Sequence, residues 1–346
     1  MFKKSDSLFL KGIAILLLLY HHNPVLGNGD VYPVFEIGCR CCVWIFLFIT
    51  AYGFSAQMSA GYSAHPFKFI IKRLALLYFP YWIYEVFFFF NTVLLNRALI
   101  TDMWNENKYA FLLEIFNLED LFGRKHLWSH WYINFVVVLI VVFPIIHFLV
   151  KKIGYLSIPL AYALIVVNPF DIYSLNGGYY SSYYLVIVIG IVFYEKKLFE
   201  KIKRLSGIKA VAVTSAGTAV LVALFFLNYR YTDLVESTKI LRPDPISTLM
   251  AMTVVLLVYL ARKDGKISNI MERLGKYSAG IFYVHSLYYV YIFTAFPVYH
   301  KWLSFFICLA VSTFISASVE QIKTATKYNE RLRSKLALIL HEDRKK

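Results

Sequence analysis

Long apolar runs recur along the chain between Leu8 and Val319, separated by charged or Pro- and Gly-rich stretches. A membrane-spanning helix needs about 20 mostly apolar residues, and lipid admits only backbone whose polar groups are paired within the protein. The pattern therefore predicts an all-α membrane protein, a polytopic bundle of about ten transmembrane helices. Their expected bounds are Leu8–Leu26, Ile37–Met58, Leu74–Leu95, Leu127–Val150, Ile153–Val167, Tyr179–Tyr194, Ala210–Leu227, Ile246–Ala261, Tyr277–Phe296 and Trp302–Val319.

Composition agrees with this pattern. Of the 346 residues, 59% are hydrophobic and 16% are charged, whereas soluble domains average about 45–50% apolar and about 25% charged residues. The four cysteines show neither zinc-site spacing nor a disulfide framework. We expect one transmembrane domain over residues 1–320 and a basic amphipathic cytoplasmic tail over residues 321–346, with no bound metal and no permanently bound cofactor.

The net charge of +15 is compatible with nucleic acid, anionic lipid or a small anion as the partner. Cytoplasmic loops of membrane proteins retain Lys and Arg, and an N-terminus inside places most of the 36 basic residues on the inner side. This distribution predicts that both termini are cytoplasmic and that the chain is a multi-pass protein of the inner (cytoplasmic) cell membrane. Membrane lipids are then expected partners, the tail lies on the anionic inner leaflet, and no nucleic-acid partner is needed.

Two polar residues stand within the first predicted helix, where charged groups cost about 2.5–3.5 kcal/mol on insertion scales. Lys11 and His22 are eleven residues apart, so at 100° per residue they lie on one face of a helix, about 16 Å apart along its axis. Taken singly, each also fits a structural role, as a snorkelling lysine or as a histidine bonded at the outer rim. Their shared face favours a functional stripe.

The stretch LKGIAILLLLYHH, which ends at His22, resembles the start of the acyltransferase 3 family of integral membrane acyltransferases. The hallmark of that family is Arg or Lys, ten residues, then His, and Lys11 and His22 fill it in its lysine form. Similar stretches follow in the family's order, namely CVWIFLFITAYGF (42–54), KFIIKRLALLYFPYW (68–82), HWYINFVVVLIVVFP (130–144) and LGKYSAGIFYVH (274–285). One departure is that many members carry a second arginine a turn after Arg73, where this chain has Leu76 and Leu77.

The resemblance implies an O-acetyltransferase type of enzyme. It would move an acyl group, usually acetyl, from cytoplasmic acyl-CoA to a hydroxyl of an extracytoplasmic glycan or lipid-linked sugar, such as a surface polysaccharide or exopolysaccharide. An imidazole with a pKa near 6.5 can take the proton of a hydroxyl that attacks a thioester. We predict His22 in that role, as general base or as transient acyl carrier, with Lys11 as the second catalytic residue.

Cations on the inner side would hold the phosphates of acetyl-CoA, the donor substrate. Lys11, Lys72 and Arg73 are the candidates, although the last two also fit a positive-inside cluster that only orients the helices. On the outer side, Arg40 either stabilises an oxyanion or binds an anionic glycan, or it snorkels to the interface.

Each of the remaining candidate site residues also fits a purely structural role. His130, Trp131 and Tyr132 either contact the acceptor or belong to an interfacial aromatic belt. His285 is either a further site residue or a packing histidine, expected about eight residues into its helix and roughly 12 Å from the inner surface.

The competing function class is a polysaccharide or lipid exporter, or a proton-coupled transporter that uses Glu85 and His285. Transporters commonly contain inverted or parallel repeats. The sequence shows no such repeat, and an exporter gives no reason for the Lys11–His22 stripe.

Overall fold

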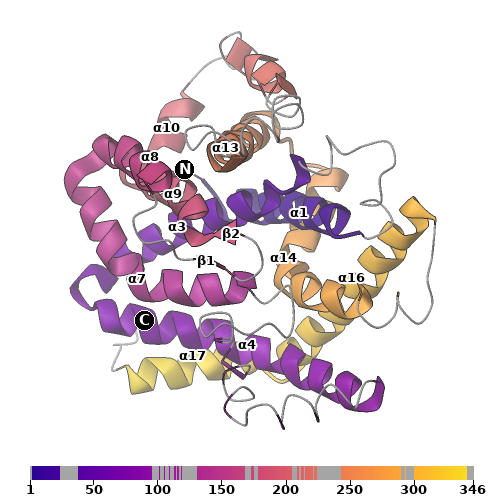
Figure 1. Ribbon diagram of the computed structural model, residues 1–346. Coiled ribbons are helices and arrows are strands. Elements are labelled where there is room, and N and C mark those ends of the chain that lie inside the picture. The colour runs from indigo at the N-terminus through magenta and orange to yellow at the C-terminus, as the bar shows by residue number, and fades with distance from the viewer. Residues whose placement is uncertain are drawn as a thin grey trace.

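The computed structural model describes residues 2–23, 38–95, 131–167, 178–204, 243–289 and 300–340, with Tyr173, Ser174, Phe293 and short pieces within 101–118 and 209–223. This part of the chain is almost wholly helical (Figure 1), which confirms the all-α class. Its one ladder pairs the two-residue strands β1 (Tyr173–Ser174) and β2 (Gly178–Tyr179) in antiparallel register.

Most of the helices overlap the predicted apolar runs. They are α1 (Lys4–His21), α3 (Cys42–Ser59), α4 (Pro66–Leu95), α7 (Trp131–Ile153), α8 (Ser157–Val167), α9 (Tyr184–Glu195), α10 (Leu198–Lys203), α13 (Pro243–Ala261), α14 (Lys266–Leu287), α16 (Lys301–Ala325) and α17 (Tyr328–Ile339). Short 3-10 turns occur at η1 (Tyr62–Ala64), η3 (Gly154–Leu156) and η4 (Tyr180–Tyr183).

Three stretches within the described residues are long and apolar enough to cross a membrane, namely Cys42–Ser59, Trp131–Ile165 and Trp302–Ala325. Shorter apolar helices accompany them at Tyr184–Glu195 and Pro245–Ala261. The protein is therefore a helical membrane protein. The count of ten helices and the orientation of the termini stay predictions, and the expected helix Ala210–Leu227 is described only in part.

Two helices begin eight or more residues before their predicted apolar runs. Helix α4 begins at Pro66 rather than Leu74, and α14 begins at Lys266 rather than Tyr277. Proline is favoured in the first turn of a helix. A backbone N–H at that position has no partner within the helix, so proline, which has no N–H, loses no hydrogen bond there. The first turns of α14 are amphipathic, so a criterion based on continuous apolar residues places the start of the helix too late.

Helices α1 and α14 pack with their backbones in contact. A Cβ atom on Gly12 would overlap the carbonyl group of Met271, and one on Gly275 would overlap the carbonyl group of Leu8. Small residues at such crossings let membrane helices approach closely. The close crossing ties the helix that carries Lys11 and His22 to α14.

The first turns of these two helices are joined by Arg262, which follows α13. Its guanidinium contacts the Asp6 carboxylate and lies 2.7 Å from Glu272 Oε1, 3.0 Å from Ser268 Oγ and 3.2 Å from Ser5 Oγ. The Arg262 side chain is only 8% exposed, and a buried guanidinium is tolerated only when its donors are satisfied. We infer that this clamp fixes the register of α1 on α14.

Candidate active site

His22 and His285 meet at the ends of α1 and α14 that lie away from the Arg262 clamp. His22 is the C-cap residue of α1, and its backbone N–H donates to the carbonyl of Leu18 at 3.0 Å. Its Nδ1 atom lies 2.9 Å from Nε2 of His285. The two ring planes differ by 10°, with centroids 5.1 Å apart, and His285 is fully buried.

The partners of His285 assign the protons of this pair. His285 Nδ1 contacts the carbonyl oxygen of Phe282, which only accepts hydrogen bonds, so this nitrogen carries the hydrogen. The Nε2 atom of neutral His285 is then an acceptor, and His22 Nδ1 is the donor to it. Neutral His22 consequently carries its lone pair on Nε2, the state that a general base requires.

The expectation that His285 lies only eight residues into its helix does not hold. Because α14 begins at Lys266, His285 comes 19 residues after its start, and His22 comes 18 residues after the start of α1. At 1.5 Å per residue, both histidines stand about 27–29 Å along their helices. The two side chains therefore reach the same level of the bundle.

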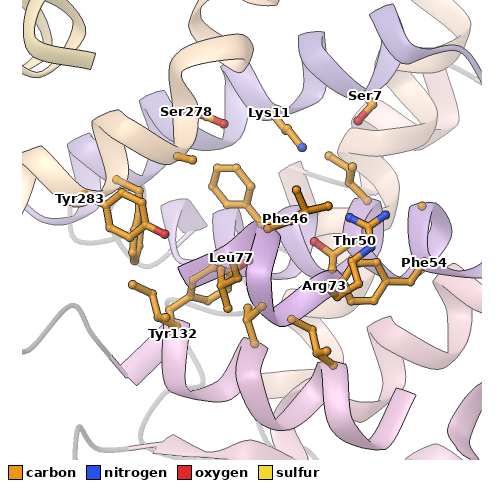
Figure 2. Close-up of a pocket in the computed structure, with 18 of the residues that line it drawn as sticks. Ser7, Lys11, Phe46, Thr50, Phe54, Arg73, Leu77, Tyr132, Ser278 and Tyr283 are labelled. Atoms are coloured by element: carbon orange, nitrogen blue, oxygen red, sulfur yellow. The ribbon is translucent and has the colours of Figure 1, made fainter. Parts of the chain in front are cut away.

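A cavity of about 430 Å³ lies among α1, α3, α4, α7 and α14. Lys11 projects into it from α1 and Arg73 from α4 (Figure 2). Most of the remaining wall is apolar and consists of Phe46, Ile49, Leu76, Leu77, Ile133, Val136 and Ile140. Its volume falls within the range of about 300–1,000 Å³ that is usual for small-molecule sites.

The wall of the cavity nearest the histidine pair is aromatic. Tyr132, Phe282 and Tyr283 line it there, and the ring centroids of Tyr132 and Phe282 are 5.3 Å apart. The Phe282 ring lies 5.6 Å from the His285 ring. Of the described residues, neither His22 nor His285 belongs to the lining, so Phe282 stands between the cavity and the pair.

The cations of the cavity have no acidic partner in the described part of the chain. Arg73 packs its guanidinium over the Phe54 ring, 4.9 Å from the centroid, and its buried Nε atom makes no hydrogen bond there. Within the same residue ranges, no carboxylate forms an ion pair with Lys11 or Arg73. Uncompensated positive charge against apolar walls favours an anionic ligand.

The other predicted donor cation lies elsewhere. The Lys72 ammonium contacts the Tyr62 hydroxyl and lies 5.1 Å from the centroid of that ring. Lys72 is not among the described residues that line the cavity. The structure thus groups Lys11 with Arg73 and directs Lys72 to η1.

The predicted acceptor residues are distributed around the His22 end. Arg40 is exposed, and its charge acts on His21, the neighbour of His22. Trp131 stacks on Tyr183, with centroids 5.7 Å apart and planes at 20°. Tyr132 lines the cavity instead, and His130 lies outside the described residues.

Sequence reasoning missed the contribution of α14 to the cavity. Ser278 and Phe282 both line it and are one turn apart, and His285 follows Phe282 by three residues. Residues spaced by three and four positions share one face of a helix. This spacing was the available signal, within the segment LGKYSAGIFYVH.

The chain matches the model of the acyltransferase 3 family, described as an acyltransferase domain, over residues 9–320. The matched region contains the histidine pair and both cations of the cavity. No curated protein and no solved structure matches the chain. Because the matched region covers nearly the whole chain, the protein belongs to the acyltransferase 3 family of membrane acyltransferases.

Proposed function

We propose that the protein is an O-acyltransferase that moves an acyl group, usually acetyl, from acyl-CoA to a hydroxyl group of an extracytoplasmic glycan. The observation that carries the proposal is the order of groups along α1. Lys11 and Arg73 provide cations to the wall of the cavity, most of that wall is apolar, and the His22–His285 pair provides a base beside Phe282. The family match does not support the alternative of a polysaccharide or lipid exporter.

The donor would enter from the Lys11 end, which the charge distribution of the sequence assigns to the cytoplasm. Acyl-CoA combines an anionic nucleotide with a long flexible arm that ends in the thioester. Lys11 and Arg73 would attract the phosphates, and the apolar wall would accept the arm. The arm must then bridge the distance from Lys11 to His22, about 16 Å along the helix axis.

The acceptor hydroxyl would bind at His22 Nε2 and attack the thioester carbonyl. As the C–O bond forms, the hydroxyl proton passes to Nε2. The imidazolium that results keeps its Nδ1–H directed at His285 Nε2, which stabilises the positive charge. Collapse of the tetrahedral intermediate breaks the C–S bond, and the proton on His22 passes to the departing CoA thiolate. Direct attack by His22 Nε2, which would give an acyl-histidine, is the alternative route.

The acceptor would approach from the His22 end of the bundle. Arg40 and Trp131 lie there, and Arg40 supplies a positive charge for an oxyanion or an acidic sugar. Tyr132 and Phe282 separate this end from the cavity. In this arrangement donor and acceptor reach His22 from opposite sides.

The proposal is tested with inverted membrane vesicles that receive radiolabelled acetyl-CoA, after which the glycan fraction is extracted. We expect label in the glycan with the unchanged chain and a loss of at least about 100-fold with His22→Ala, since general-base catalysis contributes about 10²–10⁴-fold. His65→Ala removes an exposed imidazole and serves as the matched control. Normal label transfer by His22→Ala at equal protein level would refute the assignment of the base.

A further inference from the structure

The described chain continues beyond α16 into α17 (Tyr328–Ile339), which lies outside the residues 9–320 of the family match. Lys327 has a left-handed backbone with φ of 51°, and this turns the chain between the two helices. Leu336 and Leu340 are each only 5% exposed, and Figure 1 shows α17 running beside α4. The helix is therefore packed onto the bundle through its apolar side.

Three basic residues of α17 are exposed, namely Arg331, Arg333 and Lys335. Arg333 precedes buried Leu336 by three residues and therefore lies towards the packed side of the helix, whereas Arg331 lies on the opposite side. The charge of Arg333 acts on Arg73, the cation that α4 contributes to the cavity. Within the described residues, no carboxylate forms an ion pair with Arg333 or Arg73. The packing of α17 thus places a second guanidinium group, that of exposed Arg333, near Arg73.

Two neighbouring guanidinium groups repel each other, and an anion bound between them removes that repulsion. Guanidinium groups also match phosphate oxygens with two parallel hydrogen bonds. Here Arg333 is exposed to solvent, whereas Arg73 and Lys11 both line the cavity. A ligand with an anionic head and a flexible, less polar arm fits this arrangement.

We propose that α17 completes the donor site, with Arg333 and Arg73 together binding the phosphates of the nucleotide half of acyl-CoA while the thioester arm enters the cavity. The identity of the donor rests on the proposed function. The competing role for the tail is attachment to anionic lipid, which depends on its total charge. Arg331 separates the two roles, because it lies about 200° around the helix from Arg333 and carries the same charge.

The test uses the purified full-length protein in detergent and compares Arg333→Glu with the matched control Arg331→Glu. Equilibrium binding is measured with CoA and with adenosine 3′,5′-diphosphate. We expect Arg333→Glu to raise the Kd of both probes at least about tenfold, as is usual for loss of a charge-assisted contact, and Arg331→Glu to change it less than about twofold. With acetyl-CoA the KM should rise by a similar factor at unchanged kcat.

S-acetyl-pantetheine lacks the nucleotide, so its KM should be the same for Arg333→Glu and the unchanged protein. Equal effects of the two substitutions on CoA binding would overturn the proposal, as would an equal rise in KM for the pantetheine thioester. Loss of binding to anionic vesicles with an unchanged Kd for CoA would assign α17 to the membrane surface instead. Failure of the unchanged protein to bind CoA would overturn the donor assignment itself, whereas normal CoA binding by Arg333→Glu would overturn only the role of α17.

Discussion

The contact between His22 and His285 predicts a specific catalytic defect. His285→Ala removes the acceptor of the His22 Nδ1–H hydrogen bond, which spans 2.9 Å. A hydrogen bond to a charged group contributes about 1.5–3 kcal/mol, and His22 is charged only after it has taken the proton. The loss should therefore fall on the transition state and lower kcat by roughly 10- to 150-fold, with little change in the KM for acetyl-CoA.

The substitution His285→Gln separates this effect from a packing defect. The amide oxygen of glutamine is an acceptor on a side chain that reaches into the same space, so this variant should recover part of the lost kcat. Both variants are assayed as purified protein with acetyl-CoA and acceptor, and thermal unfolding is followed in parallel. An unchanged kcat in His285→Ala would refute the reasoning. Equal losses in both variants, accompanied by a raised KM, would show that His285 acts only through packing.

Three further predictions concern the crossing of α1 and α14, the cavity wall at Phe282 and the Arg262 clamp. Gly275→Ala places a Cβ against a backbone carbonyl of α1 and should abolish transfer, whereas Gly265→Ala, with nothing within 4 Å, should leave activity intact; equal activities would contradict the close crossing. Phe282→Ala opens the cavity towards the histidines and should shift the ratio of kcat/KM for butyryl-CoA over acetyl-CoA by roughly tenfold, and an unchanged ratio would argue against a barrier at this position. Arg262→Ala leaves its carboxylate partners uncompensated and should cost about 3–5 kcal/mol of stability, seen as a lower Tm in detergent, while exposed Lys263→Ala should not change the Tm.

The features that depend on local sequence were predictable. Apolar runs located most of the described helices, because the cost of unpaired backbone in lipid leaves few alternatives to a helix. The alignment of Lys11 with His22 also follows from the 3.6-residue period alone. The bounds of α1 and α3 agree with their apolar runs to within five residues, since both helices are apolar over most of their length.

The contact between the two histidines was not predictable in the same way. It joins residues 263 positions apart, and periodicity gives the face of a residue but not the helix that this face meets. The level of His285 was misjudged for a related reason, because the polar first turns of α14 do not register as part of an apolar run. To predict the contact between His22 and His285, one would have needed both the true start of α14 and the identity of the helix that it packs against.

The position of the pair is set at the other end of these helices. Arg262 binds Asp6 of α1 and Glu272 of α14. Gly12 and Gly275 let the two backbones meet, because a Cβ atom at either position would overlap the facing helix. Helices are stiff, so a register fixed near their first turns is transmitted along the axis to His22 and His285. A hydrogen bond tolerates only a few tenths of an ångström of displacement before it weakens. The residues that set this register therefore act on catalysis from a distance, and we infer that loosening the clamp would lower kcat before the bundle unfolds.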